Sequence, residues 1–229
     1  MHKKDIDKVL GEAVQTLREG GVILYPTDTV WGLGCDATNP EAVSRIFGIK
    51  RRPDSKSLVL LASDLDQIAR YVAAIPPMAI DLVEVKDKPM TIIYPGAKTY
   101  PAPTSLVPAS PPVPVVRQAH QPVPEPVEGA KADKYHLAWN AVADDGTVGI
   151  RIPMMEFCRN MAGKLGRPVV STSANISGQP TPRIFKDIPE EIKAAVDYIV
   201  DPRLEAGATG EASQIIKIGL RGEVEIIRP

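Results

Sequence analysis

Short runs of strand-forming residues alternate with amphipathic stretches along most of the chain, and this pattern limits the fold more than any other feature. The first amphipathic stretch places Ile6, Leu10 and Leu17 on one helical face and ends at Gly20-Gly21. We expect helices near residues 6–17, 40–47, 65–72, 78–85, 157–165 and 190–196, and strands at 22–25, 58–61, 90–94, 148–152, 169–170, 198–200, 215–218 and 224–227. The alternation predicts an α/β protein with a twisted mixed sheet and flanking helices.

Two helix starts carry local signals. Asn39 is a capping side chain followed by proline at the first helical position. Ser63 and Asp66 resemble a capping box in which Asp replaces the usual Glu or Gln. Between the first strand and the first of these helices, residues 27–34 are expected to form a loop, because Pro26 stops the strand.

Ten of the 23 prolines fall between Pro95 and Pro126. Such a density cannot pair into a sheet or sustain a helix. We therefore expect residues 98–134 to be an extended, disordered insertion at the surface of a single domain that spans residues 1–229. A tolerated insertion is the simpler interpretation, since surface loops accept added length cheaply; a proline-rich docking segment for a partner is the other.

Length and charge exclude several classes of protein. A chain of 229 residues suffices for one sizeable domain, and its net charge of -1 provides no overall basic field for nucleic acid. Its two cysteines do not form a disulfide framework. The first residues contain no apolar signal core, and no run approaches the roughly 20 apolar residues that cross a bilayer. We expect a soluble cytoplasmic protein that does not contact membranes.

A basic segment lies between an expected helix and an expected strand. Lys50, Arg51, Arg52 and Lys56 place four cations within seven residues. These residues are either a solvated loop near a helix C-terminus or an anion site, because guanidinium and ammonium groups suit phosphate oxygens.

Two further segments carry polar groups at strand ends. Residues 171–178 read STSANISG and offer many hydroxyl and amide groups after a short buried strand, although such a run also builds ordinary turns. In residues 147–153, Gly149 and Arg151 face away from Val148 and Ile152 on one strand. Arg151 is thus either solvated or placed to meet a carboxylate.

Several familiar catalytic patterns are missing. Gly32 and Gly34 lie too far beyond the first strand for a dinucleotide fingerprint, and no P-loop motif occurs. The three histidines, His2, His120 and His136, suggest neither a metal site nor a nucleophile–base pair. If the chain is an enzyme, we expect it to act through positioning and electrostatics.

The ordered motifs together resemble the YrdC-like threonylcarbamoyl-adenylate synthase family. Residues 25–34 read YPTDTVWGLG and are similar to the family's YPTDTVYGLG opening. Residues 50–53 are similar to its K-x-R-P, 89–91 to its PLT, 147–153 to its TVGVRVP and 171–178 to its STSANxSG. The resemblance runs from about residue 8 to the end and omits the insertion.

The resemblance implies a YrdC/RibB-like sheet around a concave, positively lined cavity. It implies a nucleotidyltransferase that makes threonylcarbamoyl-AMP and pyrophosphate from L-threonine, bicarbonate and ATP for tRNA N6-threonylcarbamoyladenosine formation. Mg²⁺ would arrive with ATP rather than on a protein metal site, and tRNA or tRNA-modification transfer proteins would be further partners.

Carried over residue by residue, the resemblance assigns roles to ten positions. The residues that would bind threonine are Thr29, Arg151, Ser173 and Ser213. The residues that would bind ATP are Arg52, Lys56, Thr147, Asn175 and Arg228, and Lys50 and Arg52 would be catalytic. The chain departs from the family's usual residues at Ser57, Leu61, Arg183, Gln214 and 201–203.

The implied chemistry suits these residues, because carboxylate, carbamate and triphosphate must lie together and cations offset their repulsion. Two alternatives stay open: an RNA-binding module that uses the same basic cavity, and a carbamoyl-transfer module. An aromatic fraction of 5% argues against a base-stacking platform, and the zinc-finger spacing of larger carbamoyltransferases is missing.

Overall fold

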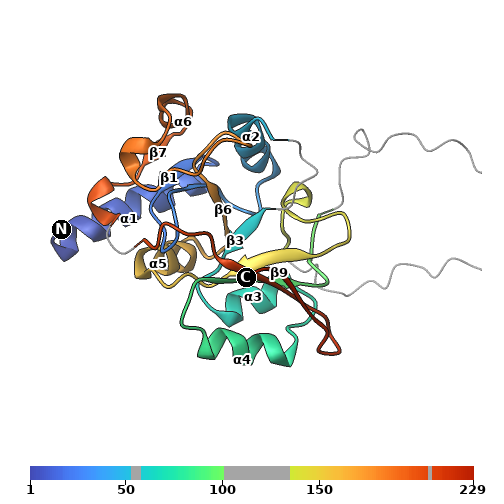
Figure 1. Cartoon of the computed structure of the whole chain (residues 1–229). Helices are drawn as coiled ribbons and strands as arrows, with labels where there is room; N and C mark the ends of the chain where they lie inside the picture. The colour runs from blue at the N-terminus through green and yellow to red at the C-terminus, as the bar shows by residue number, and fades with distance from the viewer. Residues whose placement is uncertain (53–57, 101–134, 206–207) are drawn as a thin grey trace, which may run out of the picture.

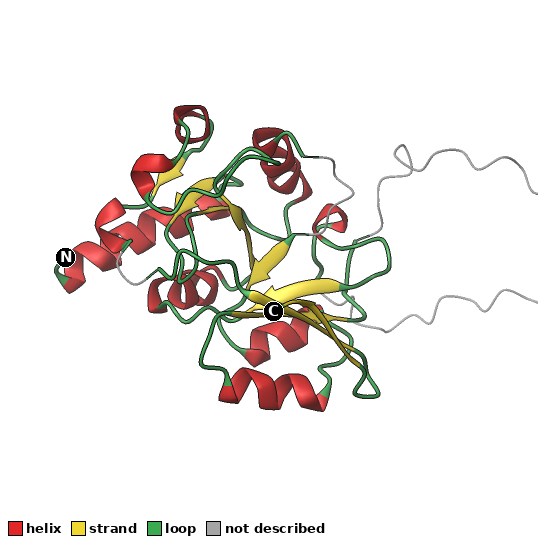
Figure 2. Ribbon diagram, viewed as in Figure 1, coloured by secondary structure: helices red, strands yellow, loops and turns green. Residues whose placement is uncertain are grey.

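The computed structural model describes residues 1–52, 58–100, 135–205 and 208–229. In these ranges a nine-stranded sheet runs through the molecule in the order β7-β1-β2-β6-β3-β5-β4-β8-β9 (Figures 1 and 2). The pairs β1–β7, β3–β5 and β4–β8 are parallel and the other pairs are antiparallel. The mixed α/β sheet that the sequence predicts is therefore confirmed.

The elements follow one another as the alternation indicates. The strands are β1 (Ile23–Tyr25), β2 (Gly32–Gly34), β3 (Val59–Leu61), β4 (Met90–Tyr94), β5 (Val148–Arg151), β6 (Val169–Ser173), β7 (Tyr198–Ile199), β8 (Gln214–Ile218) and β9 (Val224–Arg228). The α-helices are α1 (Lys3–Arg18), α2 (Pro40–Lys50), α3 (Leu65–Tyr71), α4 (Pro77–Val85), α5 (Glu156–Leu165) and α6 (Glu190–Ala194). Short 3₁₀ turns are η2 (Trp139–Ala141), η3 (Phe185–Asp187) and η4 (Pro202–Leu204).

Two hydrophobic cores lie on opposite faces of the sheet, because successive strand residues point to opposite sides. Leu60 and Val170 belong to the core that α2 and α3 cover. Their neighbours Leu61 and Val169 belong to the core that α1 and α5 cover. Figure 1 shows α1 and α5 side by side over one part of the sheet. Helices α1 and α5 therefore do not cover the whole of that face.

The helix starts agree with the local signals, with one shift. The side chain of Asn39 accepts a hydrogen bond of 3.0 Å from the amide of Ala42 and caps α2 as predicted. The cap of α3 is Asp64, which accepts a 2.7 Å bond from the amide of Gln67, whereas the Ser63 hydroxyl donates to Asp64 and the Ser63 amide donates to the side chain of Gln67. The expected capping box at Ser63 is therefore wrong by one residue, because Asp64 is the residue directly before the first helical position, Leu65.

The prediction that residues 27–34 are a loop is wrong at its end. Residues 32–34 form β2, which pairs with β1 on one side and with β6 on the other. Glycine disfavours strands in isolation, but Gly34 is needed here: a Cβ would lie 2.6 Å from the ring of Tyr25 and 2.7 Å from the carbonyl of Val170. Close packing of the strand on its neighbours therefore decides its structure.

The first three residues of the expected insertion, 98–100, lie in the described part of the chain. The amide of Lys98 donates to the carbonyl of Tyr71 at 2.9 Å, and the amide of Leu137 donates to the carbonyl of Lys98 at 2.8 Å. Residues 98–100 therefore belong to the folded domain. The remainder of the expected insertion, 101–134, lies outside the described residues.

Candidate active site

A cavity of about 360 Å³ opens on the sheet face that α1 and α5 cover only in part. Val169 packs against these helices, and Ser171 and Ser173 continue the same face of β6 into the cavity. Strands from the middle of the sheet and the segment after residue 208 form its walls. The lining residues are Thr27, Thr29, Val30, Gly32, Arg52, Val59, Arg151, Ser171, Thr172, Ser173, Thr181, Gly210, Ala212, Ser213, Ile215 and Arg228.

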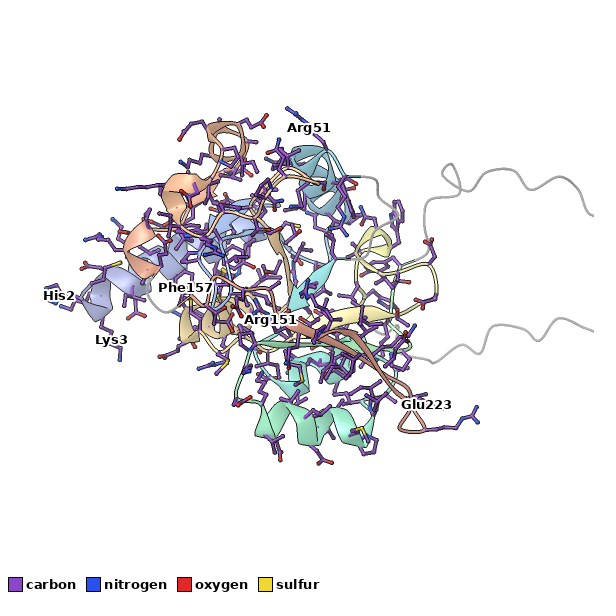
Figure 3. All side chains as sticks on the ribbon, in the orientation of Figure 1. His2, Lys3, Arg51, Arg151, Phe157 and Glu223 are labelled. Carbon is purple, nitrogen blue, oxygen red and sulfur yellow. The ribbon has the colours of Figure 1, made fainter. Side chains whose placement is uncertain are left out.

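Arg151 is held in the cavity by a buried ion pair. Its Nη1 donates to Asp28 at 2.9 Å, and both side chains are less than a tenth exposed. Asp28 also accepts a 2.8 Å bond from the amide of Met154, so the carboxylate that orients the guanidinium is itself fixed. Within the described ranges, Nε of Arg151 has no hydrogen-bond partner. The guanidinium thus keeps a donor that Asp28 does not occupy, and Arg151 lies in the middle of the molecule (Figure 3).

Two threonine hydroxyls in the β1–β2 turn contact each other, and one of them keeps an acceptor for a ligand in the cavity. The hydroxyl of Thr27 donates to the carbonyl of Val30 at 2.7 Å and shares a 2.8 Å bond with Thr29. A hydroxyl has a single proton, so Thr29 must donate in the shared bond. Its oxygen then keeps acceptor capacity, which suits an N–H group of a ligand.

The segment after residue 208 is hydrogen-bonded to this turn. The amide of Thr209 donates to the carbonyl of Asp28 at 3.0 Å, and the amide of Gly210 donates to the carbonyl of Thr29 at 2.8 Å. These bonds bring Gly210, Ala212 and Ser213 to the cavity wall although they lie far from the turn in sequence.

Two further arginines line the cavity with Arg151. Arg228 on β9 donates from Nε to the carbonyl of Ser213 at 2.8 Å, and Ser213 shares a 2.8 Å hydroxyl bond with Thr91. Burial lowers the pKa of Arg228, and the neighbouring Arg151 lowers it further. Burial also lowers the pKa of Arg52. Crowded, partly desolvated cations of this kind favour an anionic ligand.

Lys50 lies behind the cavity wall rather than in it. Its ammonium donates to the carbonyls of Ser173 at 2.5 Å and Asn175 at 2.8 Å. Burial lowers the pKa of Lys50 to about 8, with a smaller contribution from Arg52. The lysine thereby fixes the end of β6, including the backbone of Ser173.

The structure gathers six of the ten predicted site residues at the cavity: Thr29, Arg52, Arg151, Ser173, Ser213 and Arg228. Lys50 and Asn175 lie beneath it, where the Asn175 amide donates to the carbonyls of Ile176 and Gln179. Thr147 does not line this cavity as described, and its hydroxyl donates to Asp145 at 2.6 Å. Lys56 lies outside the described residues.

Sequence reasoning missed several residues of the site. Thr27, which lines the cavity, and the buried Asp28, which holds Arg151, stand in the recognised 25–34 motif, so a search for hydroxyl and carboxylate groups around Thr29 would have found them. Thr181, Gly210 and Ala212 carry no such signal. They reach the cavity only through tertiary contacts, such as the bonds between residues 209–210 and the β1–β2 turn.

Neither a protein-bound metal nor a membrane span emerges from the described ranges. Across them, no group of three or more His, Cys, Asp and Glu side chains is arranged to hold an ion. No helix in the same ranges is both long and apolar enough to cross a membrane.

Comparison with known proteins gives consistent matches. The family model for Sua5, YciO and YrdC, described as telomere recombination, matches residues 15–125 and 109–229. The chain is 31% identical over 207 residues to the threonylcarbamoyl-AMP synthase of Stenotrophomonas maltophilia, covering 90% of this chain and 89% of the relative. It is 32% identical over 207 residues to the protein of the same name from Xanthomonas euvesicatoria pv. vesicatoria, covering 90% and 91%.

Among solved structures, the chain resembles P. abyssi Sua5 complexed with L-threonine. The two are 25% identical with a TM-score of 0.67, and the match covers 93% of this chain. It covers 51% of the Sua5 chain, so this chain spans about half the length of that protein.

Proposed function

The chain belongs to the Sua5/YciO/YrdC family, and from this premise we propose that it acts as a threonylcarbamoyl-AMP synthase, the name that its curated relatives carry. The observation that carries the proposal is the cavity itself, where Arg52, Arg151 and Arg228 stand beside several hydroxyl groups. Such a lining suits the joining of an amino acid to a nucleotide, because arginines can bind the carboxylate of one and the phosphates of the other.

Arg151 is the residue we assign to the threonine carboxylate. Asp28 uses one of its terminal nitrogens and leaves the rest of the fork for a second carboxylate. Guanidinium groups bind carboxylates through paired hydrogen bonds. The acceptor oxygen of Thr29 would take an N–H of the substrate, and Ser173 and Ser213 would contact its remaining polar groups.

Arg52 and Arg228 are the residues we assign to the nucleotide phosphates, together with Lys56 of the basic segment. Mg²⁺, entering with ATP, would neutralise part of the triphosphate charge. We keep Asn175 and Thr147 as further predicted ATP contacts. Lys50 would act by fixing the Ser173 and Asn175 carbonyls, which makes it a positioning residue for the same site.

The reaction we propose is nucleotidyl transfer without a protein nucleophile. The threonine amine and bicarbonate give a carbamate with loss of water. A carbamate oxygen then forms a bond to the α-phosphorus of ATP, and the bond to the pyrophosphate group breaks. The arginines offset repulsion between the three anionic groups, and the cavity holds them in line for attack. The adenylate would serve tRNA modification in the cytoplasm, with tRNA or transfer proteins as later partners.

One assay tests this function. Pyrophosphate release from ATP is measured with and without L-threonine and bicarbonate, and with carbamoyl phosphate in place of both. We expect release only when threonine and bicarbonate are present together. Release that depends on carbamoyl phosphate would indicate the carbamoyl-transfer alternative, and salt-dependent RNA binding with no turnover would indicate the RNA-binding alternative.

A further inference from the structure

A second cavity, of about 370 Å³, lies at the opposite end of β6 from the candidate active site. The active-site cavity is lined by residues 171–173 at the end of the strand, whereas this one is lined by residues 166–167, just before the strand begins. We call it the tyrosine cavity, because its walls include three of the chain's six tyrosines, Tyr71, Tyr100 and Tyr135, with His136 and Arg167.

The rings of the tyrosine cavity form two contacting pairs. Tyr71 and Tyr135 meet edge to face, with centroids 5.7 Å apart, and Tyr100 and His136 lie 4.6 Å apart at a 30° angle. Tyr71 is 1% exposed and belongs to the core, whereas Tyr100 is 50% exposed. The buried Tyr71 ring anchors the pair, and the exposed ring of Tyr100 offers an aromatic surface to a planar ligand.

Cationic groups border these rings. The guanidinium of Arg70 lies 5.5 Å from the centroid of the Tyr135 ring. Arg167 donates to the buried Asp36 at 2.6 Å, while about half of its side chain stays exposed. Two arginines against one carboxylate leave a net positive charge at the cavity. In addition, Nδ1 of His136 is buried and has no hydrogen-bond partner in the described part of the chain.

We propose that the tyrosine cavity binds an unpaired nucleotide of an RNA strand. Every nucleobase presents a face that stacks on aromatic rings, and the phosphate beside it is attracted to arginine. The cavity volume falls at the lower end of the range of small-ligand sites, which suits a single nucleotide unit. The choice of RNA rests on the proposed function in tRNA modification; the stacking site rests on the rings and arginines alone.

The low aromatic fraction of the chain is compatible with such a site. An aromatic content of 5% seen along the sequence disfavours a broad stacking platform. The fold nevertheless collects residues 71, 100, 135 and 136 from distant segments into one place. Base stacking requires aromatic rings that lie close together in space, and the overall composition does not show this.

The test measures binding of a 5′-fluorescein-labelled hexa-adenylate RNA to the full chain by fluorescence anisotropy. Saturating ATP and L-threonine are present, and bicarbonate is omitted, so that the active site is occupied without turnover. We expect the parent to bind. Tyr100→Ala should weaken binding at least about fivefold, the lower end of the cost of removing one stacking partner, and Tyr100→Phe, which keeps the ring, should bind like the parent. Pyrophosphate release and melting temperature should be unchanged in both variants.

A matched pair of arginine variants tests the charge. Arg70→Ala should weaken binding, whereas Arg221→Ala, which removes an almost fully exposed arginine from the β8–β9 turn, should not. Absence of binding by the parent overturns the inference, and so does unchanged binding by Tyr100→Ala. Displacement of the strand by ATP and threonine would place it in the active site and also overturn the inference. Binding is read without turnover, so a chain that binds RNA but releases no pyrophosphate contradicts the proposed function alone.

Discussion

Three consecutive cations at the end of α2 have three different environments. Lys50 points inward to backbone carbonyls, Arg51 points outward to Glu191 at 2.7 Å, and Arg52 lines the cavity. The backbone turns sharply between them, because Arg51 adopts a left-handed conformation with φ of 49°. From sequence spacing alone, the three residues are interpreted together as one basic segment. The turn at Arg51 instead gives each of them a different environment.

Replacing Arg52 tests whether the cavity arginine is catalytic. We expect Arg52→Ala to reduce threonine-dependent pyrophosphate release by at least about 100-fold, as for loss of one electrostatic stabiliser. Arg51→Ala is the matched control, since it removes the adjacent exposed cation, and it should stay within about twofold of the parent. Steady-state kinetics on folded variants decide the matter, and near-normal turnover by Arg52→Ala would contradict the assignment.

Lys50→Met tests how much the Lys50 ammonium stabilises the end of β6. Loss of the ammonium leaves the carbonyls of Ser173 and Asn175 without that donor, which should lower the free energy of unfolding by about 1–3 kcal/mol. The difference should also depend on pH. Burial lowers the pKa of Lys50 to about 8, whereas lysine in an unfolded chain titrates near about 10.4.

The sign of that dependence follows from proton binding. Between these two pKa values the unfolded parent binds more protons than the folded parent, so the parent gains stability as pH rises. Lys50→Met lacks the titrating group, and its deficit relative to the parent should therefore grow between pH values of about 7.5 and about 9.5. Urea unfolding at both pH values measures this, and a deficit that stays constant would show that the lysine is not desolvated.

Among the elements, those with strong apolar periodicity were predictable and those defined by their neighbours were not. Helix α1 and strand β4 carry their burial pattern in sequence. Strand β2 and the second half of β6 do not, because glycine and hydroxyl residues are typical of turns. They are strands because Gly32 pairs with Ser173, and Val59 with Ser171, in the middle of the sheet.

The segment 101–134 should be replaceable by a short Gly/Ser linker. The described residues that flank it lie close together, since the amide of Tyr100 donates to the carbonyl of Leu137 at 3.3 Å. A short loop therefore closes at small entropic cost, and we expect the melting temperature and the threonine-dependent turnover to stay close to those of the parent.

Extending the replacement to Lys98 provides the control for that variant. The longer deletion removes the bonds of Lys98 to Tyr71 and Leu137 and should lower the melting temperature measurably. Loss of folding or turnover on replacement of 101–134 alone would show that this segment contributes to the domain or to the cavity.

At the scale of the whole molecule, the cavity is assembled from segments spread over the chain. Thr29 precedes Arg228 by almost the full sequence, yet both line the same space. Motif reasoning could predict residues within recognised segments, such as Arg151 and Ser173. It could not predict Gly210 or Ala212, because their place depends on how residues 208–213 meet the β1–β2 turn.

A cavity built in this way should select its amino acid by combined shape and polarity. We expect kcat/KM to fall in the order L-threonine, L-serine, L-valine. Serine keeps the polar groups and lacks one methyl, which is worth about 10–200-fold in an apolar sub-pocket. Valine keeps the shape but leaves a hydroxyl partner unpaired, which should cost at least as much.

Adenylate formation with each amino acid, at saturating ATP and bicarbonate, measures this order. Equal use of the three amino acids, or product formation that needs none of them, would contradict a threonine-specific pocket.

The distance in sequence between Thr27 and Arg228 also has a consequence for biosynthesis. A ribosome synthesises the β1–β2 turn long before β9, and the described residues of both hydrophobic cores all precede Arg228 in the chain. A nascent chain that has emerged only as far as residue 218 already contains β1 to β8 but lacks Arg228. Such a chain would hold the residues of both cores before the cavity has its full set of arginines, so we expect folding of the cores to precede competence for the proposed chemistry.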